Sequence, residues 1–326
     1  MSKVYFGKNI ESILEKLDYS KLGEKVAIKV HFGEKGCETY LRPELARSIY
    51  NKLKSLGKEP VLVECNVLYK GNRTNSTDHI RVAREHGFGD MTIDILDGEN
   101  GGDFVEVNGC KLGKGLEKYD SLVVLTHFKG HRMAGFGGAV KNIGMGLGSR
   151  AGKLDMHSNI KPVISDKCIG CGICVENCNA GAIIIKDGKA VIDADKCEGC
   201  AMCIAVCNSG AAGVPWSGRT SGELQERIAE YASAVLKMFP SAVFINVLAN
   251  ITKECDCHAL NQKPIMDDIG ILYSDDIVAI DKASLDLVNN RSAGGFSGIN
   301  SVDKDHQIEI AKERELGSSS YELIEC

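Results

Sequence analysis

The feature that most constrains this chain is a cysteine-rich segment that occurs twice. DKCIGCGICVENCNAGA begins at Asp166, and DKCEGCAMCIAVCNSGA begins 29 residues later at Asp195. Each copy has the spacing C-x2-C-x2-C-x3-C. This is the ligand run of bacterial ferredoxins, in which the fourth cysteine of each run binds the cluster of the other run. The sequence therefore predicts two [4Fe–4S] clusters held by one small module.

The predicted ligands form two sets that exchange their last cysteine. The first cluster takes Cys168, Cys171, Cys174 and Cys207, and the second takes Cys197, Cys200, Cys203 and Cys178. Zinc is the alternative, because paired cysteines at this spacing also bind zinc. A zinc site uses two such pairs, however, and leaves the third and fourth cysteines of each copy unexplained.

The composition indicates a globular protein and argues against two classes of partner. The 326 residues are 44% hydrophobic, which suffices for sizeable cores. Lys and Arg total 39 against 44 for Asp and Glu, and no long basic run is present, so we expect no nucleic-acid partner. No apolar run could span a bilayer and the N-terminal residues lack a signal peptide's apolar core, so we expect a cytoplasmic protein with no membrane partner.

Short, nearly continuous apolar runs recur along the chain, which is typical of parallel strands covered on both faces. The runs are VAIKV from Val26, VLV from Val61, LVVL from Leu122, VFINV from Val243 and IVAI from Ile277. Helical patterns separate some of these runs. The sequence therefore predicts an α/β fold with a mostly parallel sheet and helices on both faces.

Three helices are predicted from their start and stop signals. One begins at Pro43 and ends at Gly57, since proline suits the first helical position and glycine the left-handed residue after the last turn. Another begins near Thr77 and ends at Gly87, and a third begins after a cap at Ser221.

The dense cysteine content is confined to the middle of the chain, and strand-like runs resume only afterwards. We predict a first part of the α/β domain at residues 1–164 and an inserted 2[4Fe–4S] ferredoxin-like module at 165–214. Residues 215–326 are predicted to complete the α/β domain. Inside the module, Asp187 and Gly188 lie between two apolar runs and predict a β-hairpin.

Polar loops follow four of the predicted strands at their carboxyl ends, where open parallel sheets bind ligands in a crevice. The loop after LVVL contains His127, Lys129 and His131, which are candidate catalytic residues. It continues through many glycines, where Lys141 and Arg150 could bind an anionic small molecule. The alternative is a glycine-rich segment that only packs against the inserted module.

The loop after VFINV carries KECDCH, with two cysteines that the clusters do not need. Cys255 and Cys257 are further candidates for the catalytic site, either as soft ligands of an additional metal or as redox thiols. His258, His127 or His131 could then supply a nitrogen. The alternative is that both cysteines are inert buried thiols.

With these segments assembled, the chain resembles the iron–sulfur family known as domain of unknown function 362. The resemblance covers nearly the whole chain and rests on IKVHFGEKG, LYKGNRTNSTDH, THFKGHRMAGFGGAVKNIGMG, the doubled cysteine run, NVLANITKECDC and PIMDDIGILYSDDIVAID. It implies an α/β body with an inserted [4Fe–4S] ferredoxin module. It implies no established reaction.

The leading hypothesis is an iron–sulfur oxidoreductase in which the two clusters relay electrons to or from a site in the α/β crevice. The partner would be a redox protein or a small-molecule substrate. Two alternatives remain open. The chain could be a non-enzymatic electron carrier or redox-sensing partner protein, or an enzyme that uses the clusters structurally.

The cysteine runs predict the metal content directly. Protein purified without oxygen should contain about eight irons per chain with matching acid-labile sulfide, because each four-iron cluster needs four cysteines. Chemical iron and sulfide analysis checks this, and reduction should give interacting paramagnetic signals. Stoichiometric zinc without labile sulfide would contradict the assignment.

Overall fold

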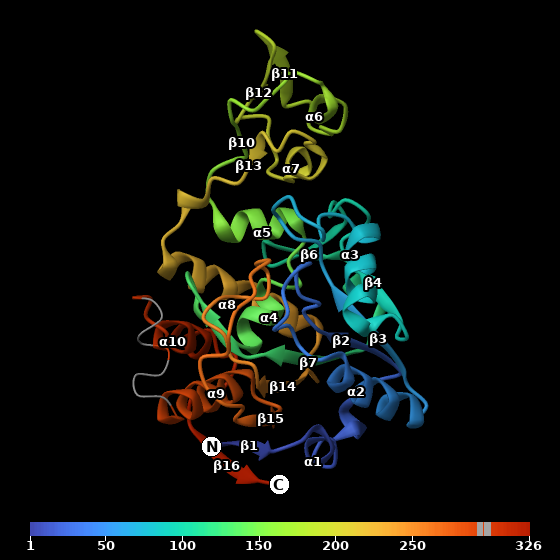
Figure 1. The fold of residues 1–326 in the computed structure, drawn as a ribbon, viewed down its shortest axis with the longest axis vertical. Coiled ribbons are helices and arrows are strands. Elements are labelled where there is room, and N and C mark those ends of the chain that lie inside the picture. The colour runs from blue at the N-terminus through green and yellow to red at the C-terminus, as the bar shows by residue number, and fades with distance from the viewer. Residues whose placement is uncertain (292–295, 297–300) are drawn as a thin grey trace.

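The computed structural model describes residues 1–291, 296 and 301–326, and in this part of the chain eight strands form a central sheet (Figure 1). The strands in sheet order are β16 (Tyr321–Glu325), β1 (Ser2–Gly7), β15 (Gly270–Ser274), β14 (Val243–Leu248), β7 (Ser121–His127), β2 (Lys25–Lys29), β3 (Glu59–Glu64) and β4 (Ile93–Ile95). The five strands from β14 to β4 are parallel, whereas β15 is antiparallel to both of its neighbours. The predicted α/β class with a mostly parallel sheet is confirmed.

Alternating residues of the central strands face two separate hydrophobic cores. In β2, Val26 and Ile28 belong to one core and Ala27 to the other, as the two-residue period of a strand requires. Helices α1 (Ile10–Leu14) and α2 (Pro43–Ser55) pack on the first face. Helices α4 (Ala139–Gly144), α8 (Ser221–Met238) and α9 (Ile277–Arg291) pack on the second. Helix α10 (Asp305–Glu313) lies against α8 and α9.

The predicted helices are present, with small shifts at their ends. Helix α2 begins at Pro43, and Gly57 after it has a φ of 75°, as expected for its end. Helix α3 (Ser76–Ala83) begins one residue before Thr77 and continues into a π-helical turn, η2 (Arg84–Phe88). Helix α8 is capped by Thr220 rather than Ser221, because Thr220 and Glu223 form a reciprocal capping box.

The strand predicted at IVAI is wrong, because Ile277 begins helix α9. Asp276 caps this helix, and its Oδ1 accepts hydrogen bonds from the N–H groups of Val278 and Ala279, both at 2.9 Å. The run is apolar throughout because α9 is buried among the sheet and its neighbouring helices. A buried helix and a buried strand are indistinguishable over four apolar residues.

Residues 163–213 form a small unit beyond the carboxyl edge of the sheet, at the top of Figure 1. It contains the strand pair β10 (Val163–Ile164) and β13 (Ala212–Gly213), the hairpin β11 (Ile183–Lys186) and β12 (Lys189–Ile192), and helices α6 (Ile173–Glu176) and α7 (Met202–Val206). The predicted turn is confirmed, with positive φ at Asp187 and Gly188. The module boundaries at 165 and 214 stay a prediction.

The two halves of this unit repeat each other in backbone conformation as well as in sequence. Gly172 before α6 has a φ of 81°, and its counterpart 29 residues later, Ala201 before α7, has a φ of 58°. A residue with a β-carbon adopts this left-handed conformation only at a cost. The second copy therefore keeps the turn even where it lacks the glycine.

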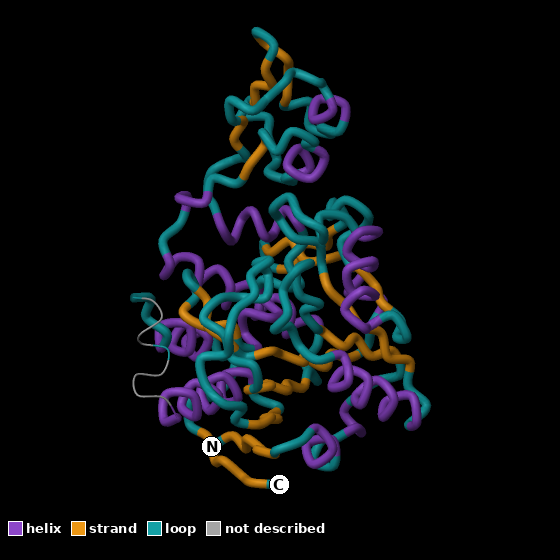
Figure 2. Tube along the Cα trace, viewed as in Figure 1, coloured by secondary structure: helices purple, strands orange, loops and turns teal. Residues whose placement is uncertain are grey.

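The remaining short elements lie in the connections between the strands of the sheet. They are β5 (Phe104–Val107), β6 (Cys110–Gly113), β8 (Lys129–His131), β9 (Gly135–Gly137), α5 (Arg150–His157), η1 (Tyr19–Lys21), η3 (Lys114–Lys118) and η4 (Trp216–Gly218). Figure 2 shows loops gathered between the central strands and the cysteine-rich unit. Among the described residues, none of the helices has the length and apolar composition needed to cross a membrane.

The capping box makes a prediction about α8. Thr220→Ala should lower the free energy of unfolding by about 1 kcal/mol, because it removes the acceptor for the Glu223 N–H. Denaturant unfolding followed by helical circular dichroism measures the change. Ser221→Ala is the matched control one residue away and should have a clearly smaller effect. An equal or larger loss of stability in Ser221→Ala would show that Ser221 is the capping residue.

Candidate functional site

The loops that follow β2, β3, β7 and β14 line one cavity of about 500 Å³ at the carboxyl edge of the sheet. From these loops and the adjoining strand ends, its wall includes His31, Glu64, Cys65, Val67, Leu68, Tyr69, Arg73, Thr126, His127, Lys129, His131, Arg132, Met133, Cys255, Cys257 and His258. The segment after β8 adds Gly137, Gly138, Lys141, Asn142, Met145, Gly146, Lys153 and His157, and the segment after the cysteine-rich unit adds Trp216. Strand polarity thus brings together the four loops that the sequence placed on one edge.

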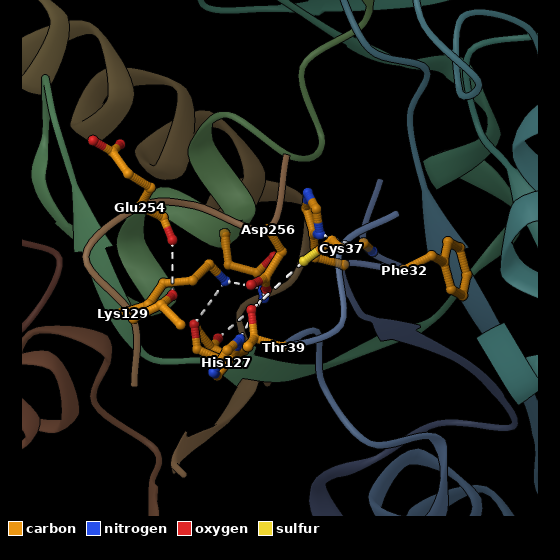
Figure 3. A network of polar contacts seen from close by, with 12 residues as sticks. Phe32, Cys37, Thr39, His127, Lys129, Glu254 and Asp256 are labelled. Atoms are coloured by element: carbon orange, nitrogen blue, oxygen red, sulfur yellow. Dashed lines mark hydrogen bonds and ion pairs between the residues drawn. The ribbon is translucent and has the colours of Figure 1, made fainter. Parts of the chain in front are cut away.

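Asp256 anchors the loop that carries the two extra cysteines (Figure 3). Its buried carboxylate lies 2.8 Å from His127 Nδ1 and 2.8 Å from Lys129 Nζ. Its backbone carbonyl accepts a hydrogen bond from the N–H of Glu34 at 2.8 Å. Burial alone would raise the pKa of Asp256, but His127 and Lys129 lower it to about 2. Sequence reasoning missed this residue, although its position between two candidate cysteines was a signal.

His127 is not free to act as a nitrogen ligand. Besides the contact with Asp256, its Nε2 lies 2.9 Å from the carbonyl oxygen of Ala249. Both ring nitrogens therefore face oxygen atoms, one of Asp256 and one of Ala249. His127 lines the cavity, but its position indicates a role in holding Asp256.

Cys255 and Cys257 both line the cavity, and their side chains contact each other. The Cys257 thiol donates a hydrogen bond to the Cys255 sulfur, which lowers the pKa of Cys255. Lys141 and Lys129 add to this effect, while burial opposes it. The same hydrogen bond raises the pKa of Cys257. Cys255 is therefore the more acidic thiol of the pair.

Lys141 is a cation in the cavity wall that pairs with no carboxylate of the described residues. Three other lining cations each pair with a carboxylate: Arg73 with Glu34, Lys129 with Asp256 and Arg132 with Glu254. Lys153 donates a hydrogen bond to the carbonyl of Gly148 at 2.6 Å. Within the described part of the chain, the Lys141 side chain has neither a hydrogen bond nor an ion pair. The wall therefore has a surplus of positive charge beside the two cysteines.

The nearby histidines are held neutral. Burial, followed by the charge of Lys141, keeps the pKa of His131 well below its ordinary value, and its Nδ1 accepts a hydrogen bond from Ala134 N–H at 3.0 Å. The same two causes lower the pKa of His157 to about 3. Because both rings are neutral, the positive charge of Lys141 is not shared with them.

Arg150 does not lie in the cavity wall, which corrects its prediction as an anion-binding residue. Its buried guanidinium donates hydrogen bonds to the backbone carbonyls of Asn100, Val67 and Thr74. Its backbone N–H contacts Asp97 at 3.2 Å. Three N–H groups of Arg150 are therefore bound by backbone carbonyls, and the residue ties the start of α5 to the loops after β3 and β4.

A buried charge network behind the cavity was also missed from the sequence. Lys29 Nζ lies 2.8 Å from Glu64 Oε1, and Arg73 Nε lies 3.2 Å from Glu34 Oε2. Glu64 Oε2 accepts no hydrogen bond among the described residues and lies 4.0 Å from Arg73 Nη1. The positions of these charges at strand ends were the available signal.

The cysteine-rich unit brings four predicted ligands to one small cavity. Cys168, Cys171, Cys174 and Cys207 all line it, so a cysteine of the second copy joins three of the first. Backbone N–H groups point at the sulfurs: Ala182 donates to Cys178 at 3.3 Å, and Ala211 to Cys207 at 3.2 Å. Such donors stabilise thiolates that hold iron–sulfur clusters, so these residues fit the predicted group.

Among the described residues, no three His, Cys, Asp or Glu side chains are close enough to hold a single metal ion. This holds for the cysteine-rich unit as well as for the cavity around Cys255. An iron–sulfur cube binds each thiolate at a different corner, so its ligands lie further apart than those of one ion.

The geometry defines an α/β protein with a ligand-sized cavity at the carboxyl edge of its sheet and a cysteine-rich unit beside it. The model of a family described as a domain of unknown function (DUF362) matches residues 26–286. The chain belongs to this family, as its motifs predicted. A search of curated proteins returned no match.

Two solved structures are similar to this chain at low sequence identity. The lactate racemase apoprotein from Thermoanaerobacterium thermosaccharolyticum is 14% identical, with 76% of this chain and 51% of that chain covered and a TM-score of 0.39. A protein from Thermotoga maritima is 10% identical, with 93% and 57% covered and a TM-score of 0.39. The matches span only about half the length of these proteins.

The shared cavity of the four thiols predicts exchanged ligands. Cys178→Ser should perturb the spectroscopic signal of the cluster held by Cys197, Cys200 and Cys203, because Cys207 already completes the other set. Paramagnetic resonance of the reduced protein distinguishes the two clusters. Cys207→Ser is the matched control and should affect the other signal. Damage by Cys178→Ser to the first cluster alone would contradict the pairing.

Proposed function

We propose that this chain is an iron–sulfur redox protein that relays single electrons between two [4Fe–4S] clusters in residues 165–214 and the cavity at the sheet edge. The clusters, when bound, supply one-electron transfer. The α/β body supplies the site for a small-molecule substrate. A redox partner protein would exchange electrons with the cysteine-rich unit. The free cysteines of this chain suit a reducing compartment, so we propose that the protein is cytoplasmic.

The observation that carries this proposal is a pair of adjacent residues that contact both regions. Lys70 Nζ donates hydrogen bonds to the backbone carbonyls of Cys207 and Asn208, at 2.6 and 2.9 Å. The Tyr69 hydroxyl donates a hydrogen bond to the backbone carbonyl of Cys257 at 2.8 Å. A predicted cluster ligand and a cavity cysteine are therefore connected through two neighbouring side chains.

The arrangement of the ligands favours one direction for the relay. Cys171 of the first set is exposed, next to Ile169, which is 73% exposed. Cys203 of the second set is buried, and Leu68 and Leu154 of the body complete the small core around it. The first set is thus accessible to a redox partner protein at Cys171, and its Cys207 contacts the body through Lys70. Cys203 of the second set also lies toward the body.

The contact through Lys70 provides the test. Lys70→Met should slow electron transfer from reduced clusters to an acceptor in the cavity several-fold, because the variant loses both bonds to residues 207 and 208. Photoreduced protein is mixed with dichlorophenolindophenol, an anionic two-electron acceptor, and the return of cluster absorbance is followed by stopped flow. Iron and sulfide content should stay unchanged.

Lys186→Met is the matched control. Lys186 is an exposed lysine of the same unit, and its side chain has neither a hydrogen bond nor an ion pair among the described residues. Equal rates in Lys70→Met and Lys186→Met would show that electrons leave the unit by another route. Clusters that accept no electrons at any accessible potential would instead favour a structural role.

A further inference from the structure

The loop around Asp256 places two thiols in the cavity on a fixed backbone. Asp256 is buried in the body, and its carboxylate and carbonyl groups are both held. The carbonyl of Cys257 accepts from the Tyr69 hydroxyl at 2.8 Å, and the carbonyl of Cys255 accepts from the N–H of His258 at 3.1 Å. The backbone is thus held at each residue of the Cys–Asp–Cys sequence while both sulfurs face the cavity.

These thiols differ from the other cysteine in the cavity wall. Cys65 is buried, its sulfur donates to the carbonyl of Leu147 at 3.5 Å, and burial raises its pKa well above the ordinary value. Cys255 instead contacts a second thiol and lies in the field of Lys141 and Lys129. A thiol with positive neighbours and a resolving thiol beside it has the surroundings of a reactive cysteine.

The other residues of the cavity wall indicate which kind of substrate Cys255 and Cys257 would act on. Lys141 provides a positive charge with no partner among the described residues. Much of the surrounding wall is apolar, with Leu68, Met133, Met145 and Trp216. A cavity of about 500 Å³ admits a small organic molecule but no protein chain segment of any length. The wall therefore suits a small organic anion with an apolar body.

We propose that Cys255 and Cys257 form a redox-active dithiol that reduces small anionic organic disulfides bound on Lys141. The Cys255 thiolate attacks one substrate sulfur, so that a mixed disulfide forms and the first substrate thiolate leaves. Cys257 then attacks the Cys255 sulfur, which forms the Cys255–Cys257 disulfide, releases the second thiolate and gives up the Cys257 proton. Two electrons have passed from the dithiol to the substrate.

Regeneration of the dithiol rests on the proposed relay. Two single electrons from reduced clusters, with two protons from water, break the Cys255–Cys257 bond and restore both thiols. The pair thereby connects one-electron carriers with a two-electron reaction. The first half of the cycle, disulfide exchange in the cavity, requires no relay and is tested separately.

The test uses the complete protein with oxidised clusters, kept without oxygen, in a Cys326→Ser background because Cys326 is an exposed free thiol. Dithiobis(nitrobenzoate), an anionic aromatic disulfide, should release two equivalents of thiolate per chain in a fast phase. Peptide mass analysis should then find a Cys255–Cys257 disulfide. Cys257→Ser should release one equivalent and retain the probe on Cys255, whereas Cys255→Ser should lose the fast phase. Cys110→Ser, at a buried cysteine outside the cavity wall, should react as the parent does.

The charge of the substrate is tested by replacing Lys141 with Met. The variant should react about tenfold more slowly with dithiobis(nitrobenzoate) but at a nearly unchanged rate with the neutral dithiodipyridine. Cluster absorbance and iron content recorded with each reaction identify variants in which the cluster cysteines have reacted instead. Equal slowing with both probes would overturn the role of Lys141.

Two further outcomes separate this proposal from the relay. Absence of the Cys255–Cys257 disulfide, or a fast phase that survives in Cys255→Ser, overturns the dithiol. If the disulfide forms but photoreduced clusters do not reopen it, the dithiol stands and the relay fails. Mass analysis of the same peptide after illumination distinguishes the two cases.

Discussion

The carboxylate of Asp256 is the interaction on which the site depends. A buried charge is costly unless it is paired, and here one carboxylate pairs with both His127 and Lys129 at the end of β7. Its backbone carbonyl binds Glu34 in the loop after β2. Three loops from three strands are therefore fixed by one residue. Loss of the carboxylate would leave the buried charge of Lys129 without its partner, a situation that costs about 3–5 kcal/mol in comparable buried pairs.

The cost of an unpaired buried charge also explains how the charged residues around the cavity are arranged. Lys29 of β2 pairs with Glu64 of β3, and Arg73 after β3 pairs with Glu34 after β2, so that buried cations meet carboxylates of the neighbouring strand or loop. These pairs account for most of the charge that the strand ends bring together. Lys141 is left without such a pair among the described residues, beside Cys255. Because Arg73, Lys129 and Arg132 of the same wall each pair with a carboxylate, Lys141 has the character of a binding group.

The sequence predicts the sheet and the meeting of four loops well, because buried parallel strands have continuous apolar runs and one shared polarity. It fails where two structures share one pattern, as at Ile277, which begins a buried helix instead of a strand. The sequence also fails to predict the partners of a long side chain, because these depend on which loops lie near it in the folded protein. Arg150 follows a glycine-rich loop as a ligand-binding arginine would, yet backbone carbonyls take its hydrogen bonds.

The segments that attach the cysteine-rich unit to the body are also part of the cavity wall. The chain leaves the body after α5 and rejoins it before α8, and the connecting strands β10 and β13 pair with each other. At these junctions His157 and Trp216 contact each other edge to face, with ring centroids 5.0 Å apart. Both side chains also line the cavity. The residues that attach the unit thus form one wall of the site, so a change in how the unit is held alters the cavity directly, without a separate coupling element.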